Sequence, residues 1–199
     1  NPINYYLLSK FISVKWPTIS ASFKISSCSG SRPTFPSLKS PGRAIDSASL
    51  AAKRKSQQHL ASVYPIIVNL DINRFYGSIY THSLPWAILG KETAKSMYKS
   101  GALKSHWSDE LDKLVRACNQ NQTVGIPIGP DTSRVLSELL LSRLDFEITS
   151  SGTKISDRQV YHNIDEYQIG VFYDNDADSA ERYFVRSLSR YELRLNDFK

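Results

Sequence analysis

Apolar residues change their spacing along this chain, and the pattern most typical of a β-strand lies at residues 66–72. This run is apolar and mostly β-branched, which predicts a strand covered on both faces. Asp71 interrupts it, and a buried carboxylate is rare unless it is paired or binds a metal ion. We therefore expect Asp71 to meet a partner from another part of the chain.

Apolar residues at helical spacing predict helices at residues 3–15, 48–61, 84–100, 108–119, 131–148 and 179–189. Trp16-Pro17 should end the first helix. Its expected apolar stripe consists of Ile3, Tyr6, Leu7, Phe11 and Val14. Ser108 and Asp131 should cap two later helices. Residues 20–49 are rich in Ser, Pro and Gly, which predicts loops and short strands.

A second β pattern covers residues 159–173, which alternate between apolar and polar and then become apolar. This pattern predicts a β-hairpin whose turn carries Asp165 and Glu166. Residues 193–198 predict one more short strand. Helices and strands of this kind together predict an α+β fold.

Composition and charge narrow the class of protein. Of the 199 residues, 41% are hydrophobic, which is enough for a core, yet no apolar run reaches the roughly 20 residues of a membrane helix. Cys28 and Cys118 lie far apart, so we expect reduced thiols in a cytoplasmic protein without a membrane anchor. Nine Lys or Arg and one acid occupy the first 60 residues. This basic segment predicts contact with polyanions, or a basic surface that is merely solvated.

Two acidic centres, Asp71 and the pair Asp165-Glu166, both interrupt β segments. Adjacent strands would bring them close together, with Asp165 as the first partner of Asp71 and Glu166 as the second. Carboxylates that close repel each other unless cations lie between them. Two Mg²⁺ ions about 3.5–4 Å apart, or Mn²⁺ in their place, would relieve the repulsion and support phosphoryl transfer. The alternative is that these are unrelated turn acids.

Four local motifs resemble those of reverse transcriptases, and specifically the abortive-infection branch of bacterial reverse transcriptases, the AbiK type of phage defence. Motif A corresponds to residues 71–76, with an extension at residues 77–86 that is typical of this branch. Motifs B, C and D correspond to residues 125–134, 163–166 and 193–199. The resemblance covers residues 64–199 and is weak before them.

The resemblance implies a role for each matching residue. Asp71, Asp165 and Glu166 would be the catalytic carboxylates and would bind two Mg²⁺ ions, with the Ile72 main-chain carbonyl as a further ligand. Tyr76 would lie under the sugar and exclude a 2′-hydroxyl. The other expected nucleotide-binding residues are Lys39, Arg43, Arg74, Phe75, Ile128 and Gly129. Lys199 would be the acid that protonates the pyrophosphate.

The motifs also depart from those of most reverse transcriptases. Glu166 replaces the usual second Asp of motif C, and Asn163 replaces the usual Tyr. Ile128 stands where many of these enzymes have Gln. Both changes in motif C favour reduced activity, whereas an apolar residue at position 128 fits weak reliance on a template.

The resemblance implies a fingers segment at residues 1–62 and a ferredoxin-like palm at residues 63–199, without the thumb and helical C-terminal domain of the family. The expected function is Mg²⁺-dependent DNA polymerisation in anti-phage defence, RNA-directed or untemplated, which adds deoxynucleoside triphosphates to a protein hydroxyl or to a primer. The alternatives are a catalytically weakened palm that binds nucleic acid or a partner, and a conventional RNA-templated reverse transcriptase. A homo-oligomer in the bacterial cytoplasm is also expected.

Overall fold

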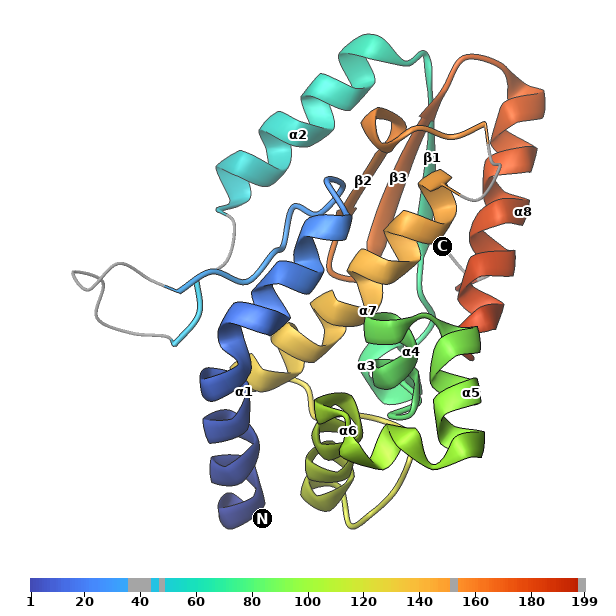
Figure 1. Cartoon of the computed structure of the whole chain (residues 1–199). Coiled ribbons are helices and arrows are strands. Elements are labelled where there is room, and N and C mark those ends of the chain that lie inside the picture. The colour runs from blue at the N-terminus through green and yellow to red at the C-terminus, as the bar shows by residue number, and fades with distance from the viewer. Residues whose placement is uncertain (36–43, 47–48, 151–153, 197–199) are drawn as a thin grey trace.

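The computed structural model describes residues 1–35, 44–46, 49–150 and 154–196, which have an α+β fold (Figure 1). Its α-helices are α1 (Pro2–Ser22), α2 (Leu50–Val63), α3 (Phe75–Ser78), α4 (Ser83–Leu89), α5 (Lys91–Ser100), α6 (Trp107–Cys118), α7 (Asp131–Ser150) and α8 (Asp174–Arg190). Its strands are β1 (Ile66–Asp71), β2 (Val160–Asn163) and β3 (Glu166–Val171). Short 3₁₀ helices lie at Phe23–Ile25, Ala102–Ser105 and Asp157–Gln159. None of the described helices is long and apolar enough to cross a membrane.

The three strands lie in the order β1-β3-β2, and both neighbouring pairs are antiparallel. The predicted hairpin is present and consists of β2 and β3. Asn163 pairs with Glu166, so the turn is formed by Ile164 and Asp165. Glu166 is thus the first residue of β3 and lies outside the turn, in contrast to the prediction.

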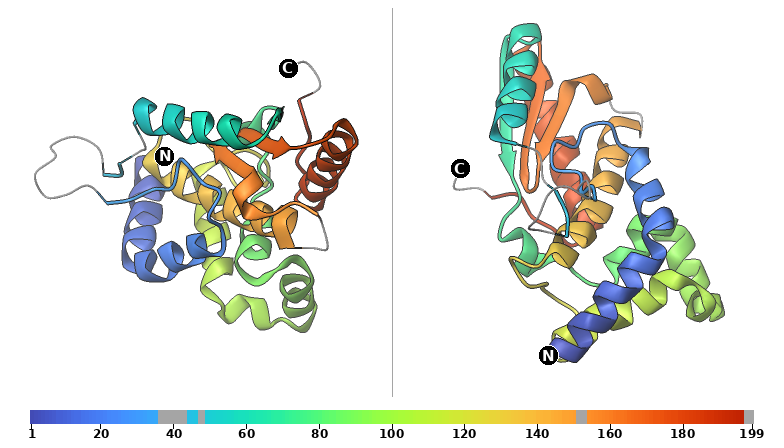
Figure 2. Two further views of the ribbon diagram at one scale, coloured as in Figure 1. Left: turned by 90° about the horizontal axis from the view of Figure 1, so that it is seen from above. Right: turned by 90° about the vertical axis from the view of Figure 1, so that its left-hand side faces the viewer.

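The two faces of the sheet differ because side chains alternate along each strand. The face toward α7 and α8 is mostly apolar and buried: Leu70, Val160, His162, Tyr167, Ile169 and Val171. The opposite face, which we call the polar sheet face, carries Asn69, Asp71, Tyr161, Asn163, Glu166 and Gln168. Helix α2 lies over the polar sheet face (Figure 2). An element therefore lies over each face of β1, as predicted, but the face under α2 is largely polar and Asn69 on it is exposed.

Helix α7 forms the centre of the core (Figure 1). It confirms the predicted helix at residues 131–148, and its buried residues are Val135, Leu136, Leu139, Leu140, Leu141, Leu144 and Ile148. Helices α1, α4 and α8 pack against it. Because apolar residues occur around most of its circumference, α7 is surrounded by other elements instead of lying on the surface.

Helix α1 continues through Pro17 to Ser22, so the prediction that Trp16-Pro17 ends it is wrong. Pro17 removes one helical N–H, but Ile19 and Phe23 beyond it are buried in the core and hold the chain in place. The expected apolar stripe does not form the buried face. That face consists of Leu8, Ile12 and Ile19, whereas Ile3, Tyr6, Leu7 and Val14 are exposed.

Other boundaries differ for local reasons. Residues 84–100 form two helices, because Gly90 has a φ of +85° and turns the chain between α4 and α5. His106 caps α6 in place of Ser108, and its ring accepts a hydrogen bond from the Ser108 N–H. Helix α8 begins at Asp174, before the predicted start at residue 179.

Two irregular segments reach the sheet. Ser29 forms a bridge with His162 of β2, so the segment before α2 lies beside the hairpin. Leu195 forms an antiparallel bridge with Ile72. The short strand predicted at residues 193–198 is therefore a single bridge in the described part of the chain.

Candidate functional site

Asp71 and Glu166 lie directly opposite each other on the polar sheet face, at the end of β1 and the start of β3. Asp165 precedes Glu166 in the turn, and its C=O accepts a hydrogen bond from the Ile72 N–H at 3.1 Å. The structure therefore brings the two acidic centres of the sequence together. The register makes Glu166, rather than Asp165, the cross-strand neighbour of Asp71.

The Asp71 carboxylate has a partner from the end of the described chain. The side-chain amide of Asn196 donates to Asp71 Oδ2 at 2.7 Å, and the Asn196 main-chain N–H donates to the Asp71 C=O at 2.8 Å. The Asn73 N–H donates to the Arg194 C=O at 2.9 Å. Residues 194–196 thus fix both the main chain and the side chain of Asp71.

Glu166 has a cationic partner from α2. Lys53 Nζ lies 2.5 Å from Glu166 Oε2, and the Glu166 side chain is 52% exposed. Beside this ion pair a cavity of about 290 Å³ lies between α2 and the polar sheet face. Its lining includes Lys53, Gln57, Asn69, Asp71, Asn163 and Gln168. Most of the residues that line the cavity are polar or charged, and both Asp71 and Glu166 are among them.

The turn that carries Asp165 is held in an uncommon conformation. Ile164 has a φ of +59°, which is unfavourable for a β-branched residue. Its N–H donates to Ser31 Oγ at 2.9 Å. The Gly30 N–H donates to the His162 C=O at 2.8 Å, and the His162 N–H donates to the Cys28 C=O at 3.0 Å. Residues 28–31 therefore support the turn from outside the hairpin.

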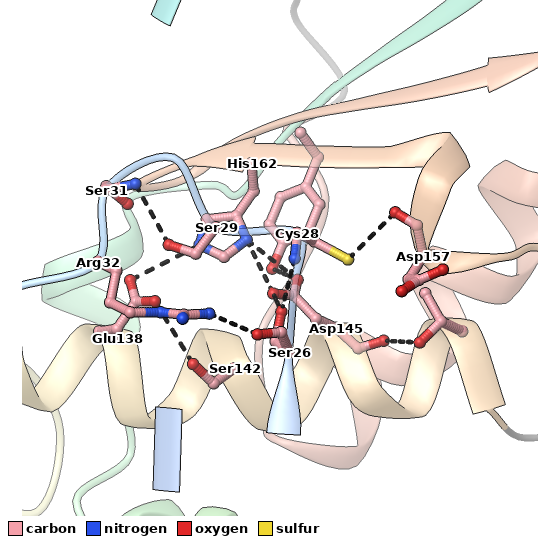
Figure 3. Close-up of polar contacts among 12 residues, drawn as sticks. Ser26, Cys28, Ser29, Ser31, Arg32, Glu138, Ser142, Asp145, Asp157 and His162 are labelled. Atoms are coloured by element: carbon pink, nitrogen blue, oxygen red, sulfur yellow. Dashed lines mark hydrogen bonds and ion pairs between the residues drawn. The ribbon is translucent and has the colours of Figure 1, made fainter. Parts of the chain in front are cut away.

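Beneath the hairpin lies a buried polar cluster around His162 (Figure 3). His162 is fully buried, with Nδ1 3.0 Å from Asp145 Oδ2 and Nε2 3.7 Å from Glu138 Oε2. Asp145 also accepts hydrogen bonds from the Tyr167 hydroxyl at 2.9 Å and from the Ser26 hydroxyl at 2.5 Å. The cluster therefore links β2 and β3 to α7 and to the segment before α2.

The pKa of His162 is raised to about 10. Burial by itself lowers this pKa, but the charge of Asp145 and its hydrogen bond, followed by Glu138, outweigh the effect of burial. His162 is therefore a cation at neutral pH. It neutralises part of the buried acidic charge directly below the hairpin.

The other residues of motif A lie beside the strand end. Phe75 is buried, Tyr76 is half-buried, and their ring centroids are 5.4 Å apart. Arg74 has a φ of +45° and is exposed. These three residues belong to the connection from β1 into α3. The aromatic pair packs against the core next to the acidic site.

The Gly- and Pro-rich loop at residues 124–130 packs against α3. The Ile126 N–H donates to the Tyr76 C=O at 2.9 Å. Gly125 has a φ of +89°, and a Cβ there would lie 3.3 Å from the Gly77 carbonyl oxygen. Gly129 has a φ of +111°, but no protein atom lies within 4 Å of a Cβ built on it. Among the described residues, the loop main chain therefore comes close to α3 at Gly125, and no such close contact is found at Gly129. The side chain of Ile128, next to Gly129, is 82% exposed.

Three residues of the expected site, Lys39, Arg43 and Lys199, lie outside the described residues. Among the residues that are described, no group of three or more His, Cys, Asp or Glu is arranged to hold a metal ion. The sequence does not single out Asn196 or His162, and Lys53 is only one of the nine basic residues among the first 60. His162 has a weak local signal, since it shares the strand period of Val160. Asn196 has none.

No protein-family model matches this chain, and the search of curated proteins also finds no match.

Proposed function

We propose that this chain is the fingers and palm of a reverse-transcriptase-like DNA polymerase of the abortive-infection type. The observation that carries the proposal is the register of β1 and β3, which sets Asp71 opposite Glu166 with Asp165 in the adjoining turn. Asp71 at the end of β1 and the pair Asp165-Glu166 at the start of β3 are carboxylates that two metal ions for nucleotidyl transfer could share. Residues 1–62 would be the fingers segment and residues 63–199 the palm.

The donor chemistry fits Mg²⁺ or Mn²⁺, which take carboxylate and carbonyl oxygens as ligands. Asp71, Asp165, Glu166 and the Ile72 carbonyl would hold the ions. When bound, the ions would lower the pKa of the attacking hydroxyl and stabilise the leaving pyrophosphate. In the present conformation the carboxylates contact protein groups instead, with Asn196 on Asp71 and Lys53 on Glu166.

The other residues would position the substrates. Tyr76 would lie under the deoxyribose, and its neighbours Phe75 and Arg74 would complete that side of the nucleotide site. Ile128, exposed at the loop that packs on α3, would contact the incoming nucleotide without a hydrogen bond, with Gly129 beside it. Lys39 and Arg43 would bind the triphosphate, and Lys199 would protonate the pyrophosphate. The polar sheet face would accept the end of the nucleic acid strand.

The expected substrates are deoxynucleoside triphosphates, with a DNA product and with or without an RNA template. Because the motifs resemble those of phage-defence proteins, we place the activity in the cytoplasm of a bacterium. There the protein would act as a homo-oligomer.

One experiment tests this function. The protein is incubated with Mg²⁺ and each labelled deoxynucleotide, with and without an RNA template and primer, and the products are separated by denaturing electrophoresis. We expect incorporation, with label retained on the protein if a protein hydroxyl is the primer. Asp71→Asn should reduce incorporation at least 100-fold, because it removes a shared metal ligand. Asp178→Asn, which changes an exposed acid on α8, is the matched control.

Retention of full activity in Asp71→Asn would contradict the two-metal assignment. Incorporation only with an RNA template would favour the conventional reverse transcriptase.

A second candidate function is a binding palm without catalysis. The contact between Lys53 and Glu166 favours it, since a lysine there takes the place that an ion would need. In that case labelled oligonucleotides would bind in fluorescence anisotropy measurements, while no nucleotide would be incorporated under any condition.

A further inference from the structure

Helix α2 is attached to the rest of the molecule by few apolar contacts. Leu60 is its only buried residue, and the other side chains that turn toward the polar sheet face are Lys53, Ser56 and Gln57, all half-buried. Most helices on a sheet are held by an apolar stripe. A polar inner side of this kind gives α2 little hydrophobic stabilisation in its present place.

The surface beneath α2 is also polar. Asn69 and Gln168 are joined across the strands by a hydrogen bond of 2.8 Å from Gln168 Nε2 to Asn69 Oδ1. The cavity of about 290 Å³ separates these residues from α2. The two surfaces therefore do not pack closely, and water or a polar ligand can occupy the space between them.

The specific polar contact across this space is the ion pair of Lys53 and Glu166, with 2.5 Å between Nζ and Oε2. Glu166 lies opposite Asp71, so the ammonium is placed at the acidic site itself. An ion pair this exposed is weak, because water screens it. A divalent cation held by Asp71 and Glu166 would attract the same carboxylate more strongly and would repel the ammonium.

The connection to β1 lets α2 move without unfolding the sheet. Only Tyr64 and Pro65 separate the end of α2 from the start of β1. The Tyr64 ring packs directly over Gly170 of β3, and its centroid is 5.1 Å from that of Phe172 just beyond the strand. Movement of α2 would therefore pivot at this anchored link.

We propose that α2 is a detachable cover of the polar sheet face, held closed by the ion pair of Lys53 with Glu166 and released when a divalent cation replaces the Lys53 ammonium at Glu166. The release step rests on the proposed function, because it requires a cation at the acidic site. The cover itself does not. In the closed state α2 blocks the face that a nucleic acid strand would occupy, so the cation both completes the site and uncovers it.

Limited digestion with trypsin tests the cover without using activity. Lys53, Arg54 and Lys55 are trypsin sites within α2, and a helix of 14 residues is marginally stable once it leaves the sheet. In EDTA, Lys53→Gln should be cleaved within α2 about two- to five-fold faster than the matched control Lys55→Gln. Each variant removes one of the three sites, and Lys55 is exposed and outside the contact with Glu166.

Mg²⁺ tests the release. It should accelerate cleavage within α2 in the wild type and in Lys55→Gln, but not in Lys53→Gln, where the contact is already lost. Asp71→Asn should abolish the acceleration. Trypsin activity toward a small peptide is measured under each condition as a control for the protease.

The possible results separate the two proposals. Equal cleavage of Lys53→Gln and Lys55→Gln in EDTA overturns the cover. Faster cleavage of Lys53→Gln without any effect of Mg²⁺ supports the ion pair as the latch. Calorimetry then decides whether the release step or the metal site is wrong. Mg²⁺ that binds without accelerating cleavage overturns the release, and a protein that does not bind Mg²⁺ overturns the proposed function.

Discussion

His162 is a buried cation held between two carboxylates, and this arrangement makes one side chain important for the hairpin. Its main chain pairs with Gly30 and Cys28, while its ring contacts Asp145 and Glu138 of α7. The hairpin turn with Asp165 begins directly after the next residue, Asn163. His162 is therefore a positioning residue: it holds the hairpin that carries Asp165 and Glu166.

We predict that His162→Gln lowers the free energy of unfolding by about 3 kcal/mol, because it leaves buried carboxylates without their cation. The loss is measured by urea denaturation at pH 7. His59→Gln is the control, since His59 is exposed on α2 and the substitution should change stability little. Equal stability of the two variants would mean that the buried charges do not stabilise the hairpin.

The same variant has a predicted pH dependence. The folded pKa of His162, about 10, lies above its usual value, so its contribution is complete below about pH 6.5 and is lost as the pH rises toward 10. The stability difference between wild type and His162→Gln should therefore shrink between these pH values. Tyr167 and Cys28, whose pKa values are also raised by burial, remain in both proteins and cancel in this difference. A difference that stays constant with pH contradicts the charged state of His162.

Two short elements, α3 and the loop at residues 124–130, are in contact at two glycines. A side chain would fit at one of them and not at the other. Gly125 has a positive φ and faces the Gly77 carbonyl, whereas a Cβ on Gly77 meets no atom within 4 Å. The loop and the helix are thus joined by main-chain contacts. Glycine is needed at position 125 in the loop but not at position 77 in α3.

We predict that Gly125→Ala lowers the free energy of unfolding by about 1–2 kcal/mol, since Ala is unfavourable at this φ and would crowd the Gly77 carbonyl. Gly77→Ala, the matched control within α3, should be neutral or raise stability by about 0.5 kcal/mol. Urea denaturation measures both. If Gly77→Ala were the more damaging substitution, the packing of the loop on α3 would be wrong.

At the scale of the whole molecule, the segments before and after residue 62 share one core. Helix α1 packs on α6 and α7, and Ser26 donates a hydrogen bond to Asp145 of α7. The proposed fingers and palm are therefore not separate folding units in the described chain.

This arrangement predicts a single unfolding transition. Trp16 lies in α1 and Trp107 begins α6, so variants that keep only Trp16 or only Trp107 of the three tryptophans report on the two parts. The urea midpoints of the two variants should agree. Leu140→Ala, at a fully buried position of α7, should lower both midpoints together, because it lowers the free energy of unfolding by about 3 kcal/mol. Separate midpoints would show two independent units.

The sequence by itself determined those elements whose pattern is local. Helices α6 and α7, strand β1 and the β2–β3 hairpin follow from the period of their apolar residues, and a helix near residues 48–61 is present as α2. The two acidic centres were also identifiable, because an acid inside an apolar β run is unusual. These signals depend on neighbours in sequence and need no knowledge of the fold.

The tertiary structure alone decided how these parts meet. The register that pairs Asp71 with Glu166, the amide of Asn196 on Asp71 and the Lys53 ammonium on Glu166 all join residues far apart in the chain. Likewise, core burial beyond Pro17 carried α1 past the residue that should have ended it. Such contacts depend on the packing of the whole molecule, so no local period of the sequence encodes them.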